Sequence, residues 1–301
     1  MAKPRPCGCK GIRTCLICES EYGATKLQNE DDFATAVQEN STFVYCPKCS
    51  GKAWSGWDEK LVMDEHPNHS GISINYPGIY IDMDFLSSSE AEILSKGIDE
   101  THWDLSQSGR RKQNFGPKCN FKKQKIAVGS FNGFPEFSLF VQEKFKLVPI
   151  MEGFQTIEQC TLEYNPDRGA SIDPHIDDCW IWGERIVTVN VKGDSVLTMT
   201  YLQEKDRVRY NLSLAPASYL QFDESLSNVI VRIPMPERSL LVMTKEARYQ
   251  WEHRILRDDV KELRLCLAYR EFTPPYLQEG ENFGPRIQEI YDLASKKVTL
   301  L

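Results

Sequence analysis

The sequence predicts a mainly β protein with flanking helices (α+β), whose core is a sandwich or jelly roll of short strands. Three observations support this fold class. Apolar and β-branched runs broken by turns fill the second half of the chain. Segments with helical spacing lie before and after those runs. Hydrophobic residues make up 41% of 301 residues, which is sufficient for a sizeable core.

The helices are expected from capping and periodicity. Ser87 and Glu90 form a capping box that opens a helix. Phe137, Val141 and Phe145 are spaced for one buried helical face. The expected helices lie at 87–97, 134–147 and 286–296, and the expected strands at 78–82, 158–164, 185–191, 195–201, 208–214, 229–234, 239–244 and 264–272.

Charge and hydropathy restrict the setting of the protein. The net charge of −7 does not indicate a general nucleic-acid binder. No apolar run is long enough to span a bilayer, and no apolar stretch follows the basic residues at the start of the chain. We therefore expect an intracellular protein, cytoplasmic and nuclear, with no membrane partner.

Six of the ten cysteines lie within residues 1–50. In a reducing compartment they are metal ligands or free thiols more often than disulfides. Four of them fall within twelve positions, a spacing that suits tetrahedral Zn(II), although a flexible reduced tail has the same spacing. The candidate zinc ligands are Cys7, Cys9, Cys15 and Cys18.

A second group of potential metal ligands follows, with Cys46 and Cys49 upstream of His66 and His69. It could form a Cys2His2 site, but the spacing is poor for a ββα finger. A mixed site with the first four cysteines is also open. We divide the chain into a Cys-rich segment (1–50), a connecting segment (51–75) and a jelly-roll domain (76–301).

Five residues of the second half carry the predicted chemistry. His175 and Asp177 lie two positions apart beyond Pro174, which favours extended backbone before it, so both side chains can share one face. Two imidazoles and one carboxylate can hold Fe(II) with three positions open, and a guanidinium can fix a dicarboxylate. The predicted iron ligands are His175, Asp177 and His253, and the predicted dicarboxylate ligands are Arg264 and Arg270.

These residues carry a family resemblance. The segment ending in Ala-Arg-Tyr-Gln-Trp-Glu-His253, with the paired arginines 264 and 270, resembles the AlkB family of Fe(II)- and 2-oxoglutarate-dependent dioxygenases. The stretches 7–18 and 107–125 are similar to one animal subfamily, that of the fourth AlkB homologue. The resemblance implies a double-stranded β-helix (jelly-roll) oxygenase core.

The resemblance also implies roles for individual residues. His175, Asp177 and His253 would be the iron ligands. Arg264 would bind the distal carboxylate of 2-oxoglutarate with help from Tyr164, and Arg270 would lie near the iron. The family often has Asn at the position occupied here by Leu162.

A basic stretch precedes the core. Between Gly109 and Ile126 there are seven basic and no acidic residues, with aromatic residues among them. By the resemblance, residues 106–126 form a lid that contacts substrate. Such a lid could grip a phosphate backbone or dock an acidic protein, and a solvated loop is the alternative. The candidate lid residues are Arg110, Arg111, Lys112, Phe115 and Lys122.

The function implied by the resemblance is oxidative demethylation with Fe(II), 2-oxoglutarate and O2. The expected substrate is N-methyl-lysine on protein, with actin as the implied partner. N6-methyladenine in DNA is the alternative substrate. A zinc-bearing binding scaffold with little activity is the non-enzyme alternative, and a hydroxylase would share every core residue.

Overall fold

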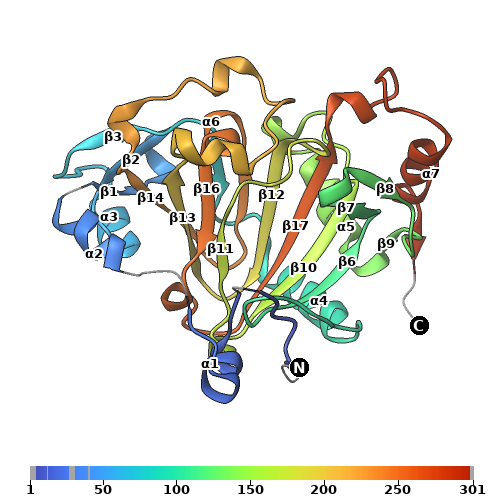
Figure 1. Ribbon diagram of the computed structural model, residues 1–301, viewed down its shortest axis with the longest axis horizontal. Coiled ribbons are helices and arrows are strands. Elements are labelled where there is room, and N and C mark those ends of the chain that lie inside the picture. The colour runs from blue at the N-terminus through green and yellow to red at the C-terminus, as the bar shows by residue number, and fades with distance from the viewer. Residues whose placement is uncertain (1–4, 12, 27–30, 40, 299–301) are drawn as a thin grey trace.

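The computed structural model describes residues 5–11, 13–26, 31–39 and 41–298. Two seven-stranded sheets face each other, and helices lie around them (Figure 1). The first sheet has the order β11 (Ile172–His175), β16 (Trp251–Ile255), β13 (Ser195–Tyr201), β14 (Ile230–Met235), β1 (Thr42–Tyr45), β2 (Lys52–Ser55) and β3 (Ser73–Asn75). The second has the order β4 (Ile79–Asp82), β15 (Leu240–Met243), β12 (Trp182–Lys192), β17 (Arg264–Phe272), β10 (Glu158–Tyr164), β6 (Arg111–Phe115) and β5 (Asp104–Leu105).

The chain passes repeatedly between the two sheets from β10 to β17. This winding is a double-stranded β-helix, so the predicted fold class is confirmed. Two small sheets are added, one from β7 (Lys118–Asn120) and β8 (Lys125–Ala127), the other from β9 (Phe134–Pro135) and β18 (Lys297–Val298). The described helices are α1 (Leu16–Tyr22), α2 (Asp31–Gln38), α3 (Glu59–Asp64), α4 (Ser88–Asp99), α5 (Leu139–Phe145), α6 (Lys245–Tyr249) and α7 (Pro285–Ala294). None of the helices in these described ranges has the length and apolarity needed to cross a membrane.

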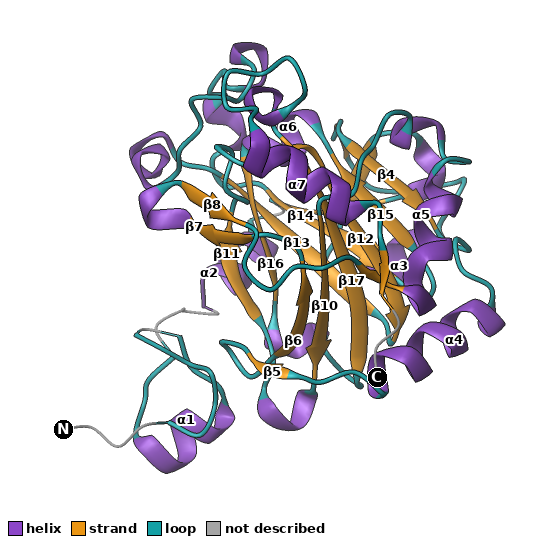
Figure 2. Ribbon diagram, turned by 90° about the vertical axis from the view of Figure 1, so that its right-hand side faces the viewer, coloured by secondary structure: helices purple, strands orange, loops and turns teal. Residues whose placement is uncertain are grey.

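Side-chain alternation in β17 explains how the sheet is buried on both faces. Its odd-numbered residues Leu265, Leu267 and Tyr269 pack in one apolar cluster with residues of α4 and α5, which cover the outer face (Figure 2). Its even-numbered residues, including Arg264 and Arg270, point to the opposite face, between the sheets. Polar groups of β17 therefore project into the interior of the barrel.

Most expected elements form. The 158–164, 195–201 and 264–272 strands have the expected bounds, and Ser87 caps α4 with the predicted capping box. The expected helix at 134–147 is wrong in its first part, where Phe134 and Pro135 pair with β18, and only Leu139–Phe145 is α-helical. Proline disfavours helical backbone at the residue before it, which explains the shorter helix.

The strand expected at 208–214 is also wrong. Residues Glu204–Arg209 form a 3-10 helix, and Val208 is 89% exposed. Arg209 and Tyr210 instead donate to the Glu252 carboxylate on β16. A segment whose polar groups bond inward and whose valine faces water has no apolar face to bury in a sheet.

The division of the chain before residue 76 differs from the expected one. Strand β1 pairs in parallel with β14 through Thr42 and Ile230, β2 pairs with β1, and β3 pairs with β2. Residues 42–55 and 73–75 therefore extend the first sheet of the barrel. Their hydrogen bonds to one another and to β14 span the boundaries that we had drawn at 50 and 75.

Candidate active site

The two histidines expected to bind iron face each other across neighbouring strands. His175 ends β11, and its register partner in β16 is His253. Their ring centroids are 4.1 Å apart. This pairing arises because β11 and β16 are antiparallel neighbours at the edge of the first sheet, although 78 positions separate the two residues in sequence.

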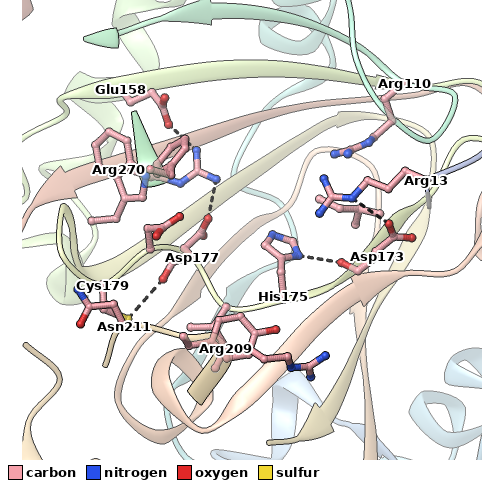
Figure 3. A pocket seen from close by; sticks show the side chains of 16 residues that line it. Arg13, Arg110, Glu158, Asp173, His175, Asp177, Cys179, Arg209, Asn211 and Arg270 are labelled. Carbon is pink, nitrogen blue, oxygen red and sulfur yellow. Dashed lines mark hydrogen bonds and ion pairs between the residues drawn. The ribbon is translucent and has the colours of Figure 1, made fainter. Parts of the chain in front are cut away.

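The orientation of His175 is fixed from behind. Its Nδ1 lies 2.9 Å from the carbonyl oxygen of Asp173 (Figure 3). A carbonyl only accepts, so Nδ1 carries the proton and Nε2 keeps its lone pair for a metal. Burial lowers the pKa of both His175 and His253, which favours the neutral imidazoles that a metal needs.

Asp177 lies two residues beyond the end of β11 and is 8% exposed. Its Oδ1 accepts from Arg270 Nη2 at 3.0 Å, whereas Oδ2 is buried without a hydrogen-bond partner among the described residues. Burial would raise the pKa of Asp177, but the surrounding positive charge, chiefly the Arg270 guanidinium, outweighs it and holds the pKa well below its ordinary value. An ionised oxygen without a hydrogen-bond partner in the described part of the chain, beside two neutral imidazoles, fits a divalent cation.

Arg270 links the predicted ligand to the neighbouring strand. Its Nη1 donates to Glu158 Oε2 at 2.5 Å, and Glu158 is its register partner on β10. The backbone of Asp177 is held as well, because buried Arg248 donates to its carbonyl at 3.0 Å. Glu158 and Arg248 thus position Asp177 indirectly, and neither was expected from the sequence.

Arg264 lies deeper between the sheets and is 1% exposed. Its Nε donates to Asn190 Oδ1 at 2.8 Å, and its guanidinium lies over the ring of Tyr164, 4.9 Å from the centroid. Nη1 is buried and has no partner in the described part of the chain. Asn190, on β12, thus supplies an amide next to this arginine, whereas the family position at Leu162 carries none. Burial raises the pKa of Tyr164, which therefore stays a neutral phenol.

A cavity of about 470 Å³ opens over His175 and Asp177. Of the five candidate lid residues, only Arg110 lines it; Phe121 of the same stretch also does. Arg111 is instead paired with Glu163 and lies over the Trp103 ring. Lys112 and Phe115 lie on β6, and Lys122 is exposed in a 3-10 turn.

Other segments that the sequence did not indicate complete the cavity wall. Arg13, from the Cys-rich segment, lies 3.2 Å from the Asp173 carboxylate and also lines the cavity (Figure 3). The segment that does not form the expected strand supplies Arg209, Tyr210 and Asn211. No sequence signal marks Arg13, because its place depends on long-range packing of the Cys-rich segment.

Within the Cys-rich segment, residues 5–11 and 13–26 form a small lobe at one edge of the barrel, around α1 (Figure 2). The four sulfur atoms of Cys7, Cys9, Cys15 and Cys18 all lie within 4.8 Å of one another. Glu19 of α1 accepts from both terminal nitrogens of Arg257, at 2.9 and 2.8 Å, which ties the lobe to the barrel. The four predicted zinc ligands are therefore brought together beside the cavity.

A jelly roll with facing histidines, a carboxylate and buried arginines is the architecture of the 2-oxoglutarate (α-ketoglutarate) oxygenases. The chain is 39% identical to human "Alpha-ketoglutarate-dependent dioxygenase alkB homolog 4" over 295 residues, covering 95% of this chain and 91% of that protein. The mouse protein of the same description is 38% identical over 287 residues, 91% and 89% of the two chains. The chain therefore belongs to the AlkB family of α-ketoglutarate-dependent dioxygenases, and it is an enzyme of that class.

A further relative is the Caenorhabditis elegans protein described as "DNA N6-methyl adenine demethylase", 31% identical over 304 residues, 98% of this chain and 96% of that one. Among solved structures, OsALKBH1 covers 66% of this chain and 100% of its own with a TM-score of 0.41 and 9% identity. A Pseudomonas putida prolyl-4-hydroxylase covers 71% of this chain and 97% of its own with a TM-score of 0.38 and 14% identity. No protein-family model matches the chain.

Proposed function

We propose that the protein is an oxidative N-demethylase that uses Fe(II), 2-oxoglutarate and O2, with methyl-lysine on a protein as its substrate. The observation that carries the proposal is the unpaired, buried Oδ2 of Asp177 beside the facing imidazoles of His175 and His253. These three side chains would hold iron, which supplies the oxidising power for attack on a C–H bond when it is bound.

The arginines would bind the co-substrate. Arg264 offers a buried Nη1 that has no hydrogen-bond partner among the described residues, which suits the distal carboxylate, and the Tyr164 ring beneath it keeps the guanidinium in place. Arg270 balances the charge of Asp177 and donates to its Oδ1. The carboxylate therefore remains ionised, and its Oδ2 is directed away from Arg270.

The proposed overall reaction is balanced. One oxygen atom of O2 enters succinate as 2-oxoglutarate loses CO2, and the other enters the N-methyl group as a hydroxyl. The hydroxymethyl amine then breaks its C–N bond, and the amine leaves with the hydroxyl proton while formaldehyde is released. The residues of the chain orient the methyl group toward the histidines.

Four arginines line the cavity, but one carboxylate in its wall supports a cationic methylamine. Four carboxylates line the cavity, and three of them are paired with Arg13 or Arg270. The fourth, Asp178, makes no ion pair with a described residue, and burial followed by the charge of Asp177 raises its pKa. A methylammonium group would relieve the repulsion between Asp177 and Asp178. It would also place positive charge on the partner, which suits an enzyme with a net charge of −7. We propose actin as the protein partner from the subfamily resemblance, and the cytoplasm and nucleus as the location.

N6-methyladenine in DNA is a second candidate because the C. elegans relative is named a DNA N6-methyl adenine demethylase. Tyr210 and the half-exposed Phe121 line the cavity and could stack on a base. Arg13, Arg110 and Arg209 are the cations that would meet phosphates. If DNA is the substrate, its affinity should fall steeply with salt, and these arginines should set the slope.

We also propose that Cys7, Cys9, Cys15 and Cys18 hold Zn(II). All four are free thiols, and the Sγ atoms of Cys15 and Cys18 are 3.7 Å apart. Sulfurs bound tetrahedrally at about 2.3 Å from zinc lie roughly 3.8 Å apart. Zinc here would order the loop that carries Arg13 into the cavity.

The test is turnover by protein reconstituted with Fe(II) without oxygen and then exposed to air. Succinate and formaldehyde are measured with methyl-lysine peptides of actin and, separately, with N6-methyladenine oligonucleotides. His175→Ala should abolish both products. His102→Ala is the matched control, because the His102 side chain is 89% exposed, and it should leave turnover unchanged.

Each outcome decides between the candidates. Formaldehyde with the peptide alone supports the first proposal, and formaldehyde with the oligonucleotide alone transfers it to the second. Succinate with a hydroxylated product and no formaldehyde would show a hydroxylase. Absence of iron binding would refute the assignment of the three ligands.

A further inference from the structure

A second cluster of metal-ligating side chains lies outside the active site. The ligand atoms of Cys46, Cys49, His66 and His69 all lie within 4.8 Å of one another. Cys49 Sγ is 3.3 Å from His66 Nδ1 and 3.3 Å from His69 Nε2, and Cys46 Sγ is 3.8 Å from His66 Nδ1. The sequence spacing is poor for a zinc finger. In the structure, however, the four side chains converge at the edge of the first sheet, and no zinc-finger fold is needed to bring them together.

The distances match a tetrahedral zinc ion. With Zn–S bonds of about 2.3 Å and Zn–N bonds of about 2.0–2.1 Å, sulfur and nitrogen ligands lie roughly 3.5 Å apart. The observed sulfur–nitrogen separations of 3.3 and 3.8 Å bracket that value. A single thiol–imidazole hydrogen bond would need only one cysteine sulfur and one histidine ring. It would not explain why a second cysteine and a second histidine converge on the same point.

The local backbone supplies both cysteines from one tight turn. Residues Pro47–Cys49 form a 3-10 turn in which the Cys49 amide donates to the Cys46 carbonyl at 3.0 Å. Ser50 and Gly51 then take φ values of 45° and 79°, which return the chain into β2. Such a turn directs both side chains to the same side.

The histidines are held against the same turn. The ring of His69 is stacked on Trp54 of β2, with centroids 4.4 Å apart and planes inclined by 14°. Its Nδ1 is buried and has no hydrogen-bond partner in the described part of the chain. Stacking on Trp54 therefore fixes the ring with Nε2 directed at Cys49.

We propose that Cys46, Cys49, His66 and His69 form a structural Cys2His2 site for Zn(II), separate from the active site and from the four-cysteine cluster. Two thiolates and two imidazoles are a ligand set that zinc takes in closed sites, and four protein ligands leave no open position for catalysis. The ion joins the β1–β2 turn to the segment before β3.

The site fastens the corner at which the chain crosses from the first sheet to the second. Beside the turn, the Tyr76 amide donates to the Gly51 carbonyl at 2.7 Å, and the Tyr45 hydroxyl donates to the Ile79 carbonyl on β4 at 3.0 Å. Tyr76 in turn packs edge-on against Trp251 of β16, at 4.8 Å between centroids. Zinc thus supports the end of the strand that carries His253.

The first measurement is zinc content and zinc X-ray absorption on the full chain. Two equivalents of zinc are expected, one for each cluster. One cluster offers four sulfurs and the other two sulfurs and two nitrogens, so the average coordination sphere should hold three sulfurs and one nitrogen. A sphere of four sulfurs with one equivalent would overturn the proposal, as would a Cys46–Cys49 disulfide in protein prepared under reducing conditions. The same measurements on His175→Ala identify any zinc held at the active site.

Variants separate the two clusters. His69→Gln should lose one equivalent and raise the sulfur share, whereas His69→Cys should retain two equivalents and lower the nitrogen share. Cys15→Ser should lose the other equivalent and leave the mixed sphere. Retention of two equivalents by His69→Gln with an unchanged spectrum would refute the role of His69, and the wild-type spectrum decides the matter if a variant fails to fold.

Discussion

Arg264 is a buried cation without a carboxylate partner among the described residues. Its removal should therefore change the stability of the protein in opposite directions with and without 2-oxoglutarate. Its contacts are one hydrogen bond to Asn190, a weak one to Met235 Sδ at 3.7 Å and the Tyr164 ring. Keeping an unpaired charge buried costs several kcal/mol. We therefore expect Arg264→Met to leave the free energy of unfolding of the ligand-free protein unchanged or raised.

The effect on the co-substrate is large. Removing one partner of a buried charge pair costs about 3–5 kcal/mol. At about 1.4 kcal/mol for each factor of ten, 2-oxoglutarate should bind roughly a hundred- to several-thousand-fold more weakly. Wild type at a ligand concentration of about 100 Kd gains about 2.7 kcal/mol. With an unfolding entropy of about 2.1 cal/mol/K for each of 301 residues, this shifts Tm by about 4 °C.

The assay is thermal unfolding with Mn(II) in place of iron, across a 2-oxoglutarate titration. Arg232→Met is the matched control, because Arg232 is 2% exposed but is paired with Asp259 at 2.7 Å. It should lose about 3–5 kcal/mol of stability and keep its ligand-induced shift. Two outcomes would contradict this prediction. One is that Arg264→Met keeps the Tm shift that 2-oxoglutarate causes in wild type, and the other is that it destabilises the ligand-free protein as much as Arg232→Met does.

Three further changes have defined outcomes. Arg13→Gln should raise the substrate KM several-fold and leave kcat within about twofold, because Arg13 lines the cavity wall and pairs with Asp173, not with a predicted iron ligand; steady-state kinetics checks this. Glu163→Gln should cost about 2–3 kcal/mol in urea unfolding at pH 7. Burial alone would raise the pKa of Glu163, but Arg111 and Arg168 outweigh it and lower the pKa. The stability that the Glu163 ion pairs contribute is therefore present above the ordinary pKa of 4.5, and it should be lost as the pH falls through the lowered pKa. Cys15→Ser should release zinc from the four-cysteine cluster and raise KM as Arg13→Gln does; an unchanged KM would uncouple the lobe from the cavity.

The sequence predicted most of the strands that are buried on both faces. Strand β17 reads as one apolar run because its outward residues meet α4 and α5, while Arg264 and Arg270 are spaced to share the inner face. Strand β16 was not predicted as an element, although His253 was predicted as a ligand. Its residues Glu252, His253 and Arg254 are polar, Glu252 accepting from Arg209 and Arg254 donating to Thr200, so the apolar pattern of a strand is missing there.

The missed parts of the site share one cause. Arg13, Tyr210 and the convergence of Cys46 with His66 depend on contacts between segments far apart in the chain, and local periodicity carries no record of such contacts. Asn190 is similar, since its pairing with Arg264 follows from the register between β12 and β17. Ligand spacing was informative for His175 and Asp177 because those two residues are neighbours in sequence as well as in space.

The attachment of the Cys-rich lobe has a consequence for how this enzyme could change its choice of substrate. The lobe is joined to the barrel by Arg257 with Glu19 and by Arg13 with Asp173, and it contributes a side chain to the cavity but none to the histidine–aspartate group. Substitutions in the lobe can therefore reshape selectivity while the oxidising machinery stays intact. A protein trimmed of its first 25 residues would retain every predicted iron ligand and yet differ in selectivity, because the Arg13 side chain would be missing from the cavity wall.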